Sequence, residues 1–268
     1  MRYAFTLLFC PVIANAGVVY DFSVQEVDQT NMGPESPGSS VPQVTRYFVD
    51  RGKVRVGAVG AKTVYLFKDQ TVYVVDDASR TIRVLKQATL SQVIAHYADA
   101  VRQLQEAAAA APPEDRPAAE RKASDLKQAS ARLLASAPRA YAMTVRFESV
   151  DGQECRIWEE RESDAKRLEV CVAPPAAVPG GADILDGMHV LSAFRQGGKW
   201  ALGVDFGLSD WWPDLVHLGG LPLLIREFKY DSLIREGRLT SIHPGSPSAS
   251  LWDLPHGYRV EERSDSSE

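Results

Sequence analysis

The stretch VTRYFVDRGKVRVGAVGAKTVYLFKDQTVYVVDDASRTIRVL, residues 44–85, decides the fold. Apolar and polar residues alternate through its short runs, which are Val44–Val49, Val54–Val56, Thr63–Phe67, Val72–Val75 and Thr81–Leu85. Residues that favour turns, such as Gly52, Asp69 and Asp77, separate the runs. Alternation with a period of two, interrupted by turns, predicts an antiparallel meander.

The composition is that of an ordinary globular protein. The chain has 268 residues, of which 45% are hydrophobic and 24% are charged. Its net charge of −5 gives a mildly acidic surface, so we expect no nucleic-acid partner. We predict a single β-rich domain over residues 17–262, followed by a disordered polar tail over residues 263–268.

The first residues predict a cleaved export signal over residues 1–16. Arg2 supplies a positive start, Ala4–Ala14 is apolar, and Ala14 and Ala16 are the small residues that a signal peptidase reads. The apolar run is too short to span a bilayer. We therefore expect cleavage after Ala16, no permanent membrane anchor, and a periplasmic or otherwise exported protein.

The period changes after the meander, over residues 89–137. Apolar residues fall on one stripe of a helix, namely Leu90, Val93, Ile94, Tyr97, Val101 and Leu104. Pro112 and Pro113 end this helix, and helical composition then resumes with few large apolar residues. These features predict a helical hairpin inserted between strands and lying on the surface; a disordered tether is the alternative.

Strand periodicity returns at Tyr141. Tyr141, Met143, Val145 and Phe147 share one face of this strand, and Thr144, Arg146 and Glu148 share the other. The two strands that follow suggest a charged hairpin in which Cys155 lies opposite Cys171, Glu159 opposite Arg167, and Trp158 opposite Leu168. This register favours a disulfide, and two free thiols are the alternative, because directly opposed cysteines suit a bridge only at some ladder positions.

An apolar, tryptophan-rich span gives the strongest indication of a binding site. Its candidate ligand-binding residues are Trp200, Phe206, Trp211, Trp212 and Leu215. On a curled sheet they would line or cover the concave face and accept acyl chains. The alternative is that they fill the core between the sheet and the helices.

The remaining motifs do not indicate catalysis. The histidines are scattered without the spacing of metal ligands, and Asp76-Asp77 is explained by turn chemistry. The sequence has no Gly-x-Ser-x-Gly elbow, and Cys155 and Cys171 lack the local sequence of an activated thiolate. We therefore expect no metal, no cofactor and no enzymatic activity, with an unrecognised hydrolase as an alternative because triads assemble from distant positions.

Several phrases resemble a domain-of-unknown-function family of exported bacterial proteins. They are KVRV (53–56), TVYLF (63–67), VYVVD (72–76), GQECRIW (152–158), LTSI (239–242) and ASLWDLPHGY (249–258). Such domains are similar to the outer-membrane lipoprotein carriers. The resemblance implies an α+β fold with a curled antiparallel sheet, a half-open barrel, whose concave face is covered by helices.

The resemblance and the tryptophan-rich span together predict a non-enzymatic envelope protein that binds an apolar ligand, a lipid or the acyl chain of a lipoprotein. The alternative is a structural or protein-interaction module without a small-molecule ligand. Its partner would dock on an exposed strand edge or on the helical hairpin.

Overall fold

The computed structural model describes residues 17–27, 41–134, 140–162, 165–202 and 215–262. The strands in these ranges are β1 (Val18–Glu26), β2 (Gln43–Asp50), β3 (Lys53–Ala58), β4 (Thr63–Lys68), β5 (Thr71–Asp76), β6 (Thr81–Lys86), β7 (Tyr141–Val150), β8 (Gln153–Glu162), β9 (Ala165–Ala173), β10 (Leu221–Lys229), β11 (Ser232–Pro244) and β12 (Arg259–Glu262). The helices are α1 (Gln87–Ala110), α2 (Arg116–Leu134) and α3 (Gly181–Leu202), with short 3-10 turns η1 (Pro175–Ala177), η2 (Val216–Leu218) and η3 (Ala249–Trp252). The predicted signal and tail lie outside the described residues.

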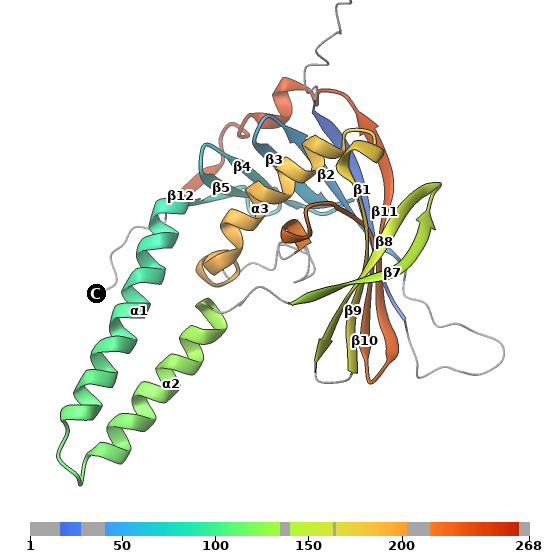
Figure 1. Ribbon diagram of the computed structural model, residues 1–268. Coiled ribbons are helices and arrows are strands. Elements are labelled where there is room, and N and C mark those ends of the chain that lie inside the picture. Colours follow the sequence, from blue (N-terminus) through green and yellow to red (C-terminus); the bar gives the residue numbers. More distant parts are fainter. Residues whose placement is uncertain (1–16, 28–40, 135–139, 163–164, 203–214, 263–268) are drawn as a thin grey trace, which may run out of the picture.

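The twelve strands form one curled sheet in the order β12-β6-β5-β4-β3-β2-β1-β11-β10-β9-β8-β7. Neighbouring strands are antiparallel except β12, which pairs with β6 in parallel. β12 and β7 end the order without pairing to each other, so the sheet is not closed (Figure 1). The predicted meander is confirmed as β2 to β6, and the fold is a mixed α+β structure dominated by this sheet.

Two-residue turns join several neighbouring strands. Each turn places two successive residues at positive φ: Arg51-Gly52 (47° and 76°), Asp69-Gln70 (52° and 56°), Asp151-Gly152 (50° and 81°), and Tyr230-Asp231 (50° and 60°). This pair of left-handed residues gives a backbone twist that matches the right-handed twist of the strands. The residues predicted to break the meander therefore set its registers.

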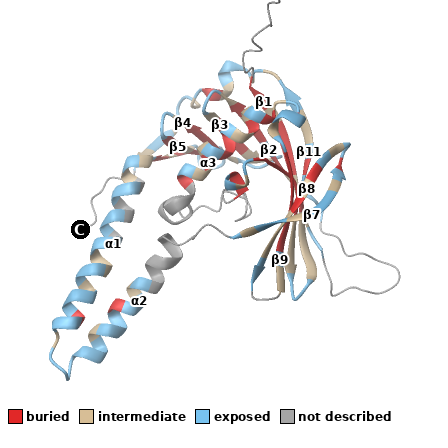
Figure 2. Cartoon of the chain, in the orientation of Figure 1, coloured by how far each residue is buried: buried red, intermediate tan, exposed pale blue. Residues whose placement is uncertain are grey.

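Helix α3 packs against one face of the sheet beside β2 and β3 (Figures 1 and 2). Its buried apolar residues recur at helical spacing and are Ile184, Met188, Leu191 and Phe194. Phe194 meets Phe67 edge to face at 5.5 Å between ring centroids. Gly187 lets the helix approach closely, because a Cβ there would lie 2.7 Å from Cγ2 of Val49. The helix extends beyond these apolar residues at both ends, from Gly181 to Leu202.

Residues 249–262, the C-terminal strap, cover the opposite face of the meander. Val75, Ile82 and Val84 form a second apolar cluster, against which Leu254 and Tyr258 of the strap pack. Side chains of the meander also bind the strap, because Arg55 donates to the Leu251 carbonyl at 3.0 Å and Lys68 to the Trp252 carbonyl at 2.8 Å. The strap brings β12 to β6, a pairing that the sequence analysis does not predict.

Helices α1 and α2 form a hairpin that projects away from the sheet (Figure 1). Its base contacts α3 and β6, and most of the described side chains of α2 are exposed (Figure 2). Ala108 and Ala123 are buried, consistent with close packing of the two helices. The hairpin thus occupies the predicted position. No helix in the described ranges is both long and apolar enough to cross a membrane.

The sulfur atoms of Cys155 and Cys171 are bonded, at 2.07 Å, so the predicted disulfide is present. The predicted register around it is wrong, because Cys171 lies opposite Ile157 and the two cysteines bridge diagonally across the ladder. Their Cα atoms are still only 5.2 Å apart, which is within the range for a disulfide.

The difference between the observed and the predicted register also changes the other predicted pairs of this hairpin. Glu159 lies opposite Glu169 instead of Arg167, and Trp158 lies opposite Val170 instead of Leu168. A bulge between Glu160 and Arg161 accounts for part of the displacement, since it inserts an extra residue into one strand. Two carboxylates consequently face each other across β8 and β9.

Candidate functional site

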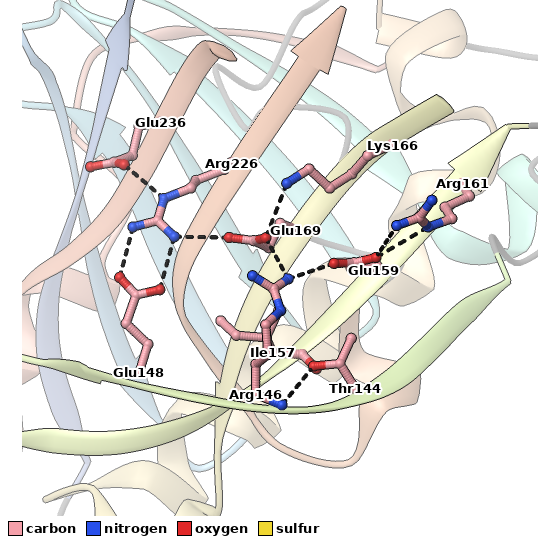
Figure 3. A network of polar contacts seen from close by, with 10 residues as sticks. All are labelled: Thr144, Arg146, Glu148, Ile157, Glu159, Arg161, Lys166, Glu169, Arg226 and Glu236. Carbon is pink, nitrogen blue, oxygen red and sulfur yellow. Dashed lines mark hydrogen bonds and ion pairs between the residues drawn. The ribbon is translucent and has the colours of Figure 1, made fainter. Parts of the chain in front are cut away.

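Strands β7 to β11 carry a network of charged side chains on one face of the sheet (Figure 3). Its four carboxylates and four cations are Glu148, Glu159, Glu169 and Glu236, and Arg146, Arg161, Lys166 and Arg226. The network is formally neutral, and each of its charges has at least one partner of opposite sign.

Glu169 of β9 lies at the centre of the network, and its side chain is only 5% exposed. It accepts hydrogen bonds from Arg146 at 2.7 Å, from Lys166 at 3.2 Å and from Arg226 at 2.8 Å. Burial alone would raise the pKa of Glu169, but these three cationic donors outweigh it and lower the pKa to about 2. Arg146 also binds Glu159, so one guanidinium neutralises the two facing carboxylates.

Arg226 of β10 joins strands that are not neighbours. Its guanidinium binds both carboxylate oxygens of Glu148 on β7, at 2.7 and 2.8 Å, and contacts Glu236 at 3.1 Å. Three strand spacings separate β10 from β7, which is about 14 Å in a flat sheet. The direct ion pair therefore indicates that the sheet curls toward this face, bringing β7 over β10.

The two central groups of the network, Glu169 and Arg226, are held in their charged forms. Acid–base catalysis needs a group whose pKa lies near the working pH. Here the hydrogen bonds that Arg226 donates to carboxylates, led by Glu148, raise the pKa of Arg226 against the opposing effect of burial, while the pKa of Glu169 falls. Both shifts move away from neutrality, so the groups stay charged. No cluster of His, Cys, Asp and Glu suited to a metal ion occurs in the described part of the chain.

The network fixes the orientation of β7, the last strand of the sheet. The register of β7 shifts between Met143 and Phe147, and within this bulge Thr144 Oγ1 donates to the Ile157 carbonyl at 2.8 Å. Arg146 extends into the network (Figure 3). Because Thr144 and Arg146 are both tied to the sheet, the residue between them, Val145, is left facing solvent.

Three apolar side chains of β7 are exposed as a result. Met143 is 56% exposed, Val145 94% and Phe147 53%. Arg156 of β8 completes the group, because its guanidinium lies 4.7 Å from the centroid of the Phe147 ring and 3.0 Å from Sδ of Met143. We call Met143, Val145, Phe147 and Arg156 the β7 patch. Exposed apolar groups of this kind are typical of surfaces that bind a partner.

Of the residues predicted to bind an apolar ligand, only Leu215 has a side chain in the described part of the chain. Leu215 is completely buried in the core. Trp200 lies in α3, but its side chain falls outside the described part, as do residues Phe206, Trp211 and Trp212 entirely. The ligand site therefore stays a prediction, while the buried apolar side chains of α3 belong to the core cluster between this helix and the sheet.

The acidic turn after β5 has the structural role predicted for it. Asp76 accepts hydrogen bonds from the backbone N–H groups of Ala78 at 2.8 Å and Ser79 at 3.2 Å. Hydrogen bonds from Ser79 and Ala78 lower the pKa of Asp76. Asp77 accepts the hydroxyl of Tyr258 at 2.9 Å, which attaches the C-terminal strap.

Sequence reasoning placed the β7 residues correctly but missed their significance. The alternation of Tyr141, Met143, Val145 and Phe147 defines a strand with one apolar face. An apolar face normally indicates burial. Nothing in the sequence signals that this strand ends the sheet, or that Tyr141 packs against the core while Met143, Val145 and Phe147 remain exposed. Arg146 and Glu148, which alternate with these apolar residues, were the available signal that the other face of the strand has a polar environment.

Comparisons with known proteins identify no family. No protein-family model matches the chain, and no curated protein is significantly similar to it. An uncharacterized conserved protein from Thermus thermophilus superposes with a TM-score of 0.43 and 5% identity, over 93% of this chain and 91% of that one. PNGF-II in a C2 crystal form superposes with a TM-score of 0.39 and 10% sequence identity, and the match covers 93% of this chain but only 31% of that one. Likenesses this distant carry no functional argument.

Proposed function

We propose that this protein is a non-enzymatic interaction module of the cell envelope that binds a partner protein through the β7 patch. The observation that supports this function is the exposure of Met143, Val145 and Phe147 on a strand at the end of the sheet. Methionine, phenylalanine and arginine, all present in the patch, are enriched in protein interfaces. The export signal and the half-open barrel belong to this proposal as predictions from the sequence.

Rigid support beneath the patch favours binding. Arg146 and Glu148 alternate with the exposed residues and are held by Glu169 and Arg226 on the other face of β7. The disulfide between Cys155 and Cys171 further constrains the adjoining strands. A surface that is already ordered loses less conformational entropy on binding, so more of its contact energy contributes to affinity.

The bulge in β7 favours recognition through side chains over the addition of a full β-strand. A partner strand needs a regular row of backbone donors and acceptors. The register shift between Met143 and Phe147 interrupts that row, and such bulges protect sheet edges from nonspecific pairing. The same bulge presents Val145, which gives the partner a projecting apolar contact.

Site-specific photocrosslinking in the producing cells tests this function. A benzoyl-phenylalanine residue at position 145 should give one discrete protein adduct on irradiation. The same residue in place of Val59, which is 57% exposed and lies between β3 and β4, is the matched control. Equal adducts at the two positions, or none at position 145, would refute the proposal.

A second variant shows whether the adduct depends on the patch. Replacing both Met143 and Phe147 by Ser in the crosslinking protein should abolish the adduct. Because both side chains are more than half exposed, these changes should alter the free energy of unfolding by only about 0.5 kcal/mol each. Thermal unfolding of the purified variants checks that the fold is kept.

A further inference from the structure

We infer that the β7 patch recognises a protein segment in which a carboxylate lies next to an apolar side chain, with Arg156 as the residue that binds the carboxylate. This inference rests on the proposed function and adds the chemistry of the partner. It follows from the charge balance of the strands around the patch.

Arg156 differs from the other arginines of β7 to β10 in its partners. Each of the others pairs with a glutamate; these are Arg146, Arg161, Arg167 and Arg226. Arg156 has no carboxylate partner among the described residues, and its guanidinium instead contacts Phe147 and Met143. Within these strands, it is the arginine whose charge a partner can neutralise.

The position of Arg156 suits it to this role. The Phe147 ring lies 4.7 Å from its guanidinium carbon and Sδ of Met143 lies 3.0 Å from Nη1, so the side chain is held in one place. A guanidinium has five N–H donors, and stacking against a ring leaves the donors at its rim available. A carboxylate can thus bind this rim while the neighbouring apolar side chain of the partner contacts Val145 and Phe147.

Sequence registers explain why this charge is isolated from the network. Arg156 alternates with Cys155 and Ile157, and lies opposite Phe147 on β7 and Val172 on β9. Glu148, Glu159 and Glu169 belong to the opposite face of these strands, where they bind the network cations. The sheet therefore separates Arg156 from the carboxylates of the network.

A peptide library supplies a probe of defined chemistry. Random decapeptides displayed on phage are selected on the purified, oxidised protein, and the enriched sequences are synthesised with a fluorescent label. We expect enrichment of Asp or Glu beside an apolar residue. Changing that acid to its amide should weaken binding at least about tenfold, because charge-assisted hydrogen bonds are the stronger class.

Variants of the protein separate the inference from the function on which it rests. Arg156→Gln should weaken the binding of the acidic peptide at least about tenfold. It should have little further effect on the binding of the amide peptide, as expected for two groups that bind each other. Arg167→Gln is the matched control, because it removes the same charge at a 47% exposed site that pairs with Glu162. The affinity for the acidic peptide should be unchanged in that variant.

The outcomes are distinguishable. If Val145→Ser abolishes peptide binding but Arg156→Gln and the amide peptide have no effect, the inference is overturned and the proposed function stands. If no selected peptide depends on Val145, both are overturned. If sedimentation shows a dimer that Val145→Ser dissociates, the occupant of the patch is a second copy of this chain, and the inference is again overturned.

Discussion

Replacing Glu169 by Gln removes the central charge of the network and keeps the size of the side chain. The pKa of Glu169 is about 2 against an ordinary value of 4.5. Because one pKa unit corresponds to about 1.4 kcal/mol, ionised Glu169 adds about 3 kcal/mol to the free energy of unfolding at neutral pH. Arg146 and Arg226 keep other carboxylate partners in the variant, so we expect a loss of about 2–3 kcal/mol.

The pH dependence follows from the direction of the shift. The pKa of Glu169 is lower in the folded protein than in the unfolded chain, so its stabilisation is complete above pH of about 5 and is lost as the pH falls toward 2. More than half of it should be gone at pH 3 by the same linkage relation. The stability difference between wild type and Glu169→Gln should therefore shrink by about 2 kcal/mol between pH 6 and pH 3.

Urea unfolding followed by tryptophan fluorescence, with the disulfide intact, measures the loss of stability at neutral pH and its change between pH 6 and pH 3. Glu162→Gln is the control, since Glu162 is 71% exposed and its ion pair with Arg167 lies at the surface. The free energy of unfolding of that variant should fall by less than about 1 kcal/mol. Equal losses for the two variants, or a difference for Glu169→Gln that does not change with pH, would refute the reasoning.

Three further predictions concern other parts of the fold. Replacing Cys155 and Cys171 by Ala should lower the free energy of unfolding by about 3 kcal/mol relative to the oxidised wild type, the expected effect of a bridge between residues 16 apart, measured by urea unfolding without reductant. Gly187→Ala usually stabilises a helix, but the new Cβ would lie 2.7 Å from Val49 Cγ2, so we expect a loss of about 1–3 kcal/mol and a lower Tm; a higher Tm would contradict the close packing of α3. Trp252→Ala should cost about 3–5 kcal/mol because this side chain of the C-terminal strap is buried, and hydrogen exchange at β6 should rise; unchanged exchange would show that the strap does not protect that edge.

The meander and the two helices of the hairpin, α1 and α2, were predictable because local patterns specify them. Period two with turn residues between the runs gave β2 to β6, and a helical stripe ended by Pro112-Pro113 gave α1. The disulfide was predicted in a wrong register, because pairing rules for Glu159 and Arg167 hold only when the two strands are the whole environment. In the folded protein Arg146, from a third strand, neutralises Glu159 and Glu169, which permits two like charges to face each other.

By itself, the sequence determined the elements: alternating strands, their turns, the helical hairpin and a pair of cysteines on neighbouring strands. Only the tertiary structure decided which strand ends the sheet and which apolar faces are covered. Helix α3 and the C-terminal strap cover the two faces of the meander, while Met143, Val145 and Phe147 of β7 remain exposed. The physical reason is that alternation records which residues share a face, whereas burial depends on what packs against that face from distant parts of the chain.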